Sequence, residues 1–122
     1  MSAERPRDEL GRPLPWEAAG FPGVPPRDDI SAEEATAEAL DYLQRGLPFH
    51  AHEVLEQRWR CCPDEERALW RALAQAAAGV THAARGNAEG ARRLQARAID
   101  GLQEYAGPRP DDLIAALGLP LA

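Results

Sequence analysis

The sequence contains no lysine, and no run of basic residues is longer than the pair Arg92–Arg93. All 14 basic side chains are therefore arginines, against 20 acidic ones, and the formal net charge of the 122-residue chain is −6. Nucleic-acid binding depends on clustered cations that neutralise phosphates. These absences predict that the partner of this protein is not a nucleic acid.

Long hydrophobic runs are missing as well. A membrane-spanning helix requires about 20 predominantly apolar residues in a row, and no stretch of this chain approaches that length. The N-terminus also lacks the basic and then apolar layout of a secretory signal peptide. The sequence therefore predicts no membrane association and a cytoplasmic location.

Cysteine is scarce, and the only two cysteines, Cys61 and Cys62, are neighbours. A disulfide between adjacent residues is strained and closes no useful loop, so reduced thiols in a reducing compartment are expected. No Cys-x-x-Cys motif is present that would indicate redox or metal chemistry. The pair is interpreted as ordinary thiols at the end of a helix.

No segment alternates between apolar and polar residues in the manner of a strand. Apolar residues make up 44% of the chain, which is ordinary for one globular domain with a modest core. The patterns that do occur have a helical period. The predicted fold is a compact all-α bundle of about five helices that occupies residues 31–122.

Local signals predict where these helices begin and end. Ser31 and Glu34 form a capping box for a helix that runs to about Arg45 and ends at Gly46. The further helices are expected over residues 49–60, 64–85, 88–106 and 111–117. The helix over 64–85 is apolar on nearly every side, which is typical of a central helix surrounded by the others.

Residues 1–30 differ from this body because they hold six of the eleven prolines, which forbid a helix of any length. They also carry large apolar side chains, among them Trp16 and Phe21. We interpret the segment as an extended arm packed on the body, with both aromatic side chains largely buried; the alternative is a flexible tail. Deletion of residues 1–27 is expected to lower the melting temperature.

The helix predicted over 49–60 has polar residues where its pattern calls for core. At about 100° per residue, an apolar face is defined by Phe49, Leu55 and Trp59. His52 lies in the middle of this face, and Glu56 lies between Phe49 and Trp59. A buried carboxylate is costly unless it is paired, so Glu56 is expected to have a hydrogen-bond partner, and Glu56→Ala is expected to destabilise by about 1–3 kcal/mol.

The helical pattern also predicts the orientation of three other residues of this helix. Glu53 falls at the edge of the apolar face, whereas His50 and Gln57 are predicted to point away from it. Replacement of Gln57, taken as exposed, is expected to change stability by less than about 0.5 kcal/mol.

On the next helix, Gln75 and His82 lie on one stripe that is expected to face the polar groups of helix 49–60. The result would be a polar pocket, with the candidate binding residues His52, Glu53, Glu56, Trp59, Gln75 and His82. Within it, Glu56 or Glu53 is expected to accept a hydrogen bond from a histidine or from Gln75, at about 3.2 Å or less.

Three interpretations of this pocket remain open. It is a structural hydrogen-bond network that fixes two helices, a site for zinc, iron or manganese with acid–base or hydrolytic chemistry, or a pocket for a small ligand or a partner's polar side chain. His-Glu-x-x-Glu is not the His-Glu-x-x-His signature of metalloproteases, and no metal ligand is assigned. The arginines of helix 88–106 could bind an anion, but acidic neighbours dilute them and a solvated face is favoured.

The residues also resemble a known family. The string from Phe49 to Arg60, which contains His-Glu-x-x-Glu-x-x-Trp, is similar to the signature of the bacterial and archaeal family named domain of unknown function 309. The segments 69–75 and 82–91, the latter with an Arg-Gly-Asn turn, continue the resemblance, which covers roughly residues 38–105. The resemblance implies a compact bundle around one central helix, and it implies no activity.

The functional prediction is a non-catalytic helical domain whose polar pocket is structural or binds a small ligand or protein partner. The alternative is a metal-dependent, hydrolytic enzyme that uses the same pocket. The sequence by itself identifies no catalytic residue, no cofactor and no oligomeric state.

Overall fold

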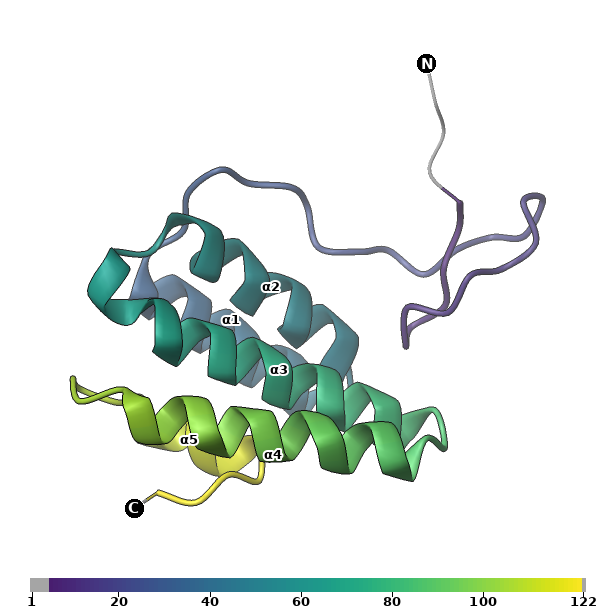
Figure 1. Cartoon of the computed structure of the whole chain (residues 1–122). Coiled ribbons are helices and arrows are strands. Elements are labelled where there is room, and N and C mark those ends of the chain that lie inside the picture. Colours follow the sequence, from purple (N-terminus) through teal and green to yellow (C-terminus); the bar gives the residue numbers. More distant parts are fainter. Residues whose placement is uncertain (1–4, 122) are drawn as a thin grey trace.

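The computed structural model describes residues 5–121, which form five α-helices and one short 3₁₀ turn (Figure 1). In chain order these elements are α1 (Ala32–Gln44), α2 (Pro48–Cys61), the 3₁₀ turn η1 (Asp64–Glu66), α3 (Arg67–Ala84), α4 (Ala88–Glu104) and α5 (Asp111–Ala116). Within residues 5–121 the only β-type pairing is an isolated bridge between Arg7 and Pro13. The predicted all-α fold is confirmed.

The predicted helix ends are confirmed to within a few residues, because the signals that set them are local. Ser31 Oγ accepts from the backbone N–H of Glu34 at 3.1 Å, and the Glu34 carboxylate accepts from the Ser31 N–H at 3.2 Å. Gly46 and Gly86 adopt φ values of 73° and 86°, a left-handed conformation that ends a helix without the strain of a Cβ atom. One difference is that residues 64–66 form a 3₁₀ turn before α3.

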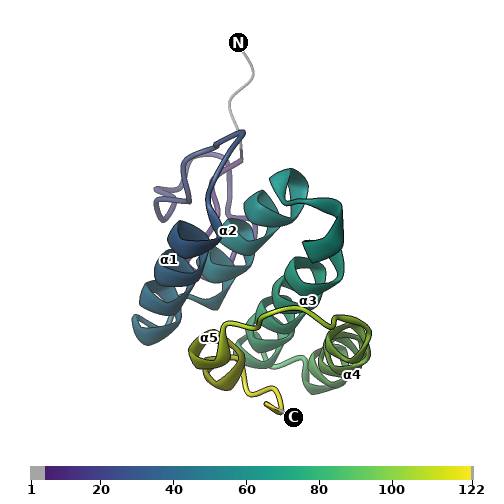
Figure 2. The same cartoon turned by 90° about the vertical axis from the view of Figure 1, so that its left-hand side faces the viewer.

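Helix α3 lies between α2 and α4 and contacts both of them (Figure 2). It buries more residues than any other described helix, including Trp70, Leu73 and Ala77. A Cβ atom on Gly79 would lie 3.3 Å from the carbonyl oxygen of Ala91 on α4, so glycine at this position allows the two helices to approach closely. The predicted central helix is confirmed.

The remaining helices close the bundle around this core. Helix α1 packs against α2, and α5 folds back to contact α1. Leu113 and Ile114, both in α5, are fully buried. Within the described part of the chain, no helix combines the length and the apolar character needed to cross a membrane.

Residues 5–30 form an arm that runs along α2 and extends past the N-terminal end of that helix (Figure 1). Gly11, at φ 77°, sits directly on the Phe49 ring, where a Cβ atom would lie 2.5 Å from the ring. The guanidinium group of Arg85, at the end of α3, donates to the carbonyl oxygen of Leu10, with Nε at 2.9 Å. The outer part of the arm is therefore fastened to both α2 and α3.

The inner part of the arm is held by its main-chain carbonyls. His50 Nε2 donates to the carbonyl oxygen of Pro22 at 2.6 Å, and Gln57 Nε2 donates to that of Pro25 at 2.9 Å. A proline residue has no N–H but keeps its carbonyl acceptor, so side-chain donors on α2 can bind this proline-rich segment.

The prediction that Trp16 and Phe21 are largely buried is wrong. Trp16 is 62% exposed and Phe21 is 42% exposed. The physical reason is that α2 binds the carbonyl oxygens of the arm, so its main chain follows a path that leaves these two side chains at the surface.

The predicted orientation of α2 is also wrong. His50 and Gln57, expected to point into solvent, are only 3% and 7% exposed, because the arm covers them. The most deeply buried residues of α2 are Ala51, Val54 and Leu55. At about 100° per residue, the centre of this buried face lies about a quarter of a turn from His52, which the sequence had placed at the centre.

Candidate functional site

The i and i+4 residues of the predicted constellation, His52 and Glu56, do contact each other. His52 Nε2 and Glu56 Oε1 lie 2.8 Å apart, which confirms the predicted bond between Glu56 and a histidine. The predicted burial of Glu56 is wrong, because its side chain is 38% exposed. Since the core face of α2 is turned away from this pair, the pair forms a half-exposed surface contact.

The other four predicted residues lie elsewhere. Trp59 and Gln75 line one cleft, and Glu53 lines a separate cavity beside the arm. His82 is at the end of α3, where its Nδ1 lies 3.0 Å from the Asn87 side-chain amide. Within residues 5–121, no hydrogen bond or ion pair joins Gln75 or His82 to α2. The structure thus distributes the predicted pocket over several places.

The described residues do not bring together the donor atoms that a metal site would require. Among the described residues, no group of three His, Cys, Asp or Glu side chains is close enough to hold a metal ion. The hydrolytic alternative depended on at least three such donors around one point. The arrangement of this part of the chain provides no such set.

The two cysteines are free thiols, with Cys61 partly buried and Cys62 buried. The Cys62 thiol faces the carbonyl oxygen of Trp59 at 3.4 Å. Burial raises the pKa of Cys62 above its ordinary value. A thiol of this kind stays protonated near neutral pH and is a poor nucleophile.

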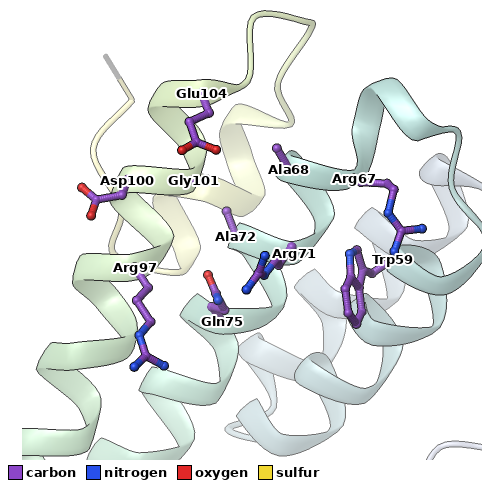
Figure 3. Close-up of a pocket in the computed structure, with 10 residues that line it drawn as sticks. All are labelled: Trp59, Arg67, Ala68, Arg71, Ala72, Gln75, Arg97, Asp100, Gly101 and Glu104. Atoms are coloured by element: carbon purple, nitrogen blue, oxygen red, sulfur yellow. The ribbon is translucent and has the colours of Figure 1, made fainter.

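The cleft that contains Trp59 and Gln75 has a volume of about 450 Å³ and lies where α2, α3 and α4 meet (Figure 3). We call it the arginine cleft, and its lining residues are Trp59, Arg67, Ala68, Arg71, Ala72, Gln75, Arg97, Asp100, Gly101 and Glu104. Small residues occupy the α3–α4 contact beneath it, where a Cβ atom on Gly101 would lie 3.2 Å from Ala72 Cβ. The close approach of the backbones leaves room above for long side chains.

Each wall of the arginine cleft has a different origin. Arg67, Arg71 and Gln75 follow one another at i, i+4 and i+8 along α3, so they share a face of that helix. Arg97 comes from α4 and lines the cleft from the other side, with its guanidinium group apart from those of Arg67 and Arg71 (Figure 3). Trp59 comes from α2, and its ring lies 5.4 Å from the guanidinium carbon of Arg67, a cation–π contact that positions this arginine.

The charges in the arginine cleft are unpaired. Arg67, Arg71 and Arg97 make no ion pair with any carboxylate within residues 5–121, and Asp100 and Glu104 pair with no arginine there. In Figure 3 the Asp100 carboxylate points away from the arginines. Three guanidinium groups are thus left free around one hollow.

The sequence offered a signal for this cleft that the interpretation missed. The spacing of Arg67, Arg71 and Gln75 marks a polar stripe on a helix that is otherwise apolar. Arg97 was expected to lie on a solvated face, and it is exposed. That face becomes one wall of a cleft only because α4 packs antiparallel to α3.

The fold and the site define a class, a small all-α bundle domain with a polar cleft between antiparallel helices. Residues 36–94 match the family model described as domain of unknown function (DUF309), so the resemblance stated from the sequence is confirmed. The matched segment begins in α1, contains α2 and α3, and ends in α4. A search of curated proteins and a search of solved structures each found no match.

Proposed function

We propose that this domain is a non-catalytic binding module that takes a small anionic ligand, a carboxylate or a phosphate ester, in the arginine cleft. One observation carries the proposal: Arg67, Arg71 and Arg97 all line the cleft, and none has a carboxylate partner among the described residues. Guanidinium groups bind carboxylates and phosphates through two parallel hydrogen bonds. An anion supplies the acceptors that these groups lack.

The remaining lining residues support a small ligand of mixed polarity. The volume of about 450 Å³ falls within the range of about 300–1,000 Å³ that is usual for ligand pockets. Gln75 can donate and accept hydrogen bonds, and Glu104 and Asp100 can accept from hydroxyl or amine groups at the rim. The ring of Trp59 provides an apolar wall.

The composition of the lining supports binding without chemistry. The cleft has no serine, threonine, cysteine or histidine among its lining residues. It therefore offers no hydroxyl or thiol nucleophile and no imidazole, and its carboxylates are those of Asp100 and Glu104 at the rim. The charged side chains of the cleft serve to bind the ligand.

The test is a titration of the full-length protein with phenyl phosphate, citrate and inorganic phosphate, followed by two-dimensional NMR of the backbone amides. Shifts are expected at residues 67–75 and near Arg97, and Arg71→Gln is expected to weaken binding of the tightest anion by about tenfold. Arg92→Gln is the matched control, because Arg92 is an exposed arginine of α4 outside the cleft. No shift with any of the anions, or equal losses in the two variants, would contradict the proposal.

We further propose that the domain acts in the cytoplasm on a partner other than nucleic acid. The adjacent thiols Cys61 and Cys62 are unbridged, which suits a reducing compartment. The net charge of −6 opposes association with a polyanion, whereas a small anion experiences chiefly the local field of the cleft.

A further inference from the structure

A second cavity of about 450 Å³ lies between the arm and a different face of α2. We call it the arm cavity, and its lining includes Arg5, Arg7, Phe21, Phe49, Glu53 and Arg60. The arm contributes one wall and α2 the other. The cavity exists only because the proline-rich segment is held against the helix.

Several polar groups of its walls already have hydrogen-bond partners, although Nδ1 of His50 is buried without one among residues 5–121. His50 donates to the carbonyl oxygen of Pro22, and Gln57 makes three hydrogen bonds to arm groups. Asp8 accepts from Arg12 Nε at 2.7 Å and from two backbone N–H groups. These contacts hold the walls in place.

Glu53 is the exception. Its side chain is half-buried and lines the cavity, yet it makes no hydrogen bond and no ion pair within residues 5–121. A carboxylate without a protein partner is free to accept hydrogen bonds from a cationic group of a ligand. Glu53 is one of the residues singled out from the sequence, and the arginine cleft gives it no role.

Free positive charge lies in the same cavity. Arg60 is exposed, and the one carboxylate it approaches within residues 5–121 is that of Glu56, at 4.0 Å, which is a weak contact. Arg5 and Arg7 each donate one N–H to a carbonyl oxygen of the arm, and a guanidinium group has five N–H donors. The cavity therefore combines one unpaired carboxylate with guanidinium groups that have donors to spare.

We infer that the arm cavity binds a zwitterion, a free amino acid or short peptide with an apolar side chain. The ligand ammonium group pairs with Glu53, its carboxylate pairs with Arg60 and the arm arginines, and its side chain lies against Phe21 and Phe49. An anion alone would face Glu53, and a cation alone would face the arginines, so a ligand with both charges fits best. The exposure of Phe21, at 42%, is then the exposure of a ligand-binding surface.

The first step of the test uses the full-length protein and a thermal-shift and NMR screen of the twenty standard L-amino acids and the dipeptides Phe-Gly and Leu-Gly. The second step uses L-phenylalanine with two truncated analogues, phenethylamine, which lacks the carboxylate, and 3-phenylpropionate, which lacks the ammonium group. The zwitterion is expected to bind about tenfold or more tightly than either analogue. Its shifts should map to residues 20–24, Phe49 and Glu53.

Two variants assign the contacts. Glu53→Gln is expected to weaken phenylalanine binding by about tenfold and to leave phenylpropionate binding unchanged or stronger. Because Glu53 has no partner in the described chain, this variant should fold normally. Glu104→Gln, in the arginine cleft, is the matched control and should leave phenylalanine binding unchanged, which separates this inference from the proposed function. Lack of millimolar binding by all the amino acids and dipeptides, or affinity that does not depend on Glu53, would overturn the inference.

Discussion

Gln57 makes three side-chain hydrogen bonds with the arm, more than any other described residue of α2. Its amide nitrogen donates to the carbonyl oxygen of Pro25 at 2.9 Å, and its oxygen accepts from Arg27 Nε at 3.0 Å and from Arg27 Nη2 at 2.8 Å. The side chain is 7% exposed. Loss of such a group leaves its partners unsatisfied in a largely dry place.

Gln57→Ala is therefore expected to lower the free energy of unfolding by about 1–3 kcal/mol. Glu56→Ala removes only a half-exposed pair with His52 and should change it by about 0.5 kcal/mol or less. Urea denaturation of both variants at pH 7 measures the difference. This order is the reverse of the one expected from the sequence, and a larger loss for Glu56→Ala would show that the described orientation of α2 is wrong.

Glu66 supplies a pH dependence that can be traced to its partners. Its Oε1 accepts from the indole N–H of the buried Trp70 at 2.8 Å and from Arg58 Nη2 at 3.1 Å. The bond from Trp70, aided by Arg58, lowers the pKa of Glu66 below its ordinary value of 4.5, although burial acts in the other direction. The folded state thus favours the charged form more than the unfolded state does.

A group with a lowered pKa contributes stability that is fully present above its unfolded pKa and is lost as the pH falls through its folded pKa. Glu66→Gln is therefore expected to reduce stability at pH 7 and to make stability less dependent on pH below about 4.5. Urea denaturation of wild type and variant between pH 3 and 7 measures both effects. Glu65→Gln, an exposed neighbour, is the control, and an acid slope of Glu66→Gln equal to that of wild type would contradict the assignment.

At the scale of elements, the arm is bound to the helical body largely through its main-chain carbonyl groups. Its carbonyl oxygens at Leu10, Pro22, Pro25 and Ile30 accept hydrogen bonds from side chains of the helical body. Its largest side chain, Trp16, is 62% exposed. The outer arm is therefore held mainly by its extended backbone, whereas its inner end also contributes the side chain of Arg27, which pairs with Glu38 at 2.8 Å, and the buried side chain of Ile30.

Deletion of residues 1–27 is expected to lower the melting temperature by about 5 °C or more, because His50 and Gln57 lose their acceptors and Arg27 is removed. Trp16→Ser should change the free energy of unfolding by less than about 0.5 kcal/mol. Thermal unfolding followed by circular dichroism compares the two. If Trp16→Ser destabilised as much as the deletion, the arm would be held by its aromatic side chains and not by its carbonyls.

Helix α2 illustrates what a helical pattern can and cannot predict. Its limits followed from Pro48 at the first turn and from the break before Pro63, both local effects. Its buried face did not follow, since Phe49 and Trp59 were taken as core and are only half-buried. The face that the arm covers belongs to a contact between segments about 30 residues apart.

At the scale of the whole molecule, the bundle provides two hollows with different chemistry. The arginine cleft depends on α2, α3 and α4, all within or overlapping the segment that matches the family model. The arm cavity depends on residues 5–26, which lie outside residues 36–94. The proposed anion site therefore lies partly in the segment that matches the family and partly beyond it, at Arg97, Asp100, Gly101 and Glu104, whereas the inferred zwitterion site also requires the arm of this chain.

The sequence by itself determined the helix number, the cap at Ser31, the helix end at Gly46 and the family resemblance. Each of these depends on a few neighbouring residues, or on a string of residues, and is readable without knowing what lies opposite. It also placed His52 and Glu56 within bonding reach, because i and i+4 residues of a helix always are neighbours.

Only the tertiary structure decided which side of α2 is buried, which acids and arginines remain unpaired, and where hollows form. These properties depend on contacts between distant segments, such as the arm on Gln57 and α4 on α3. A helical wheel ranks faces by apolar content, whereas burial is set by whatever packs against each face. Here a proline-rich arm, bound through its carbonyls, buried a histidine and a glutamine and left a carboxylate, Glu53, without a partner in the described chain.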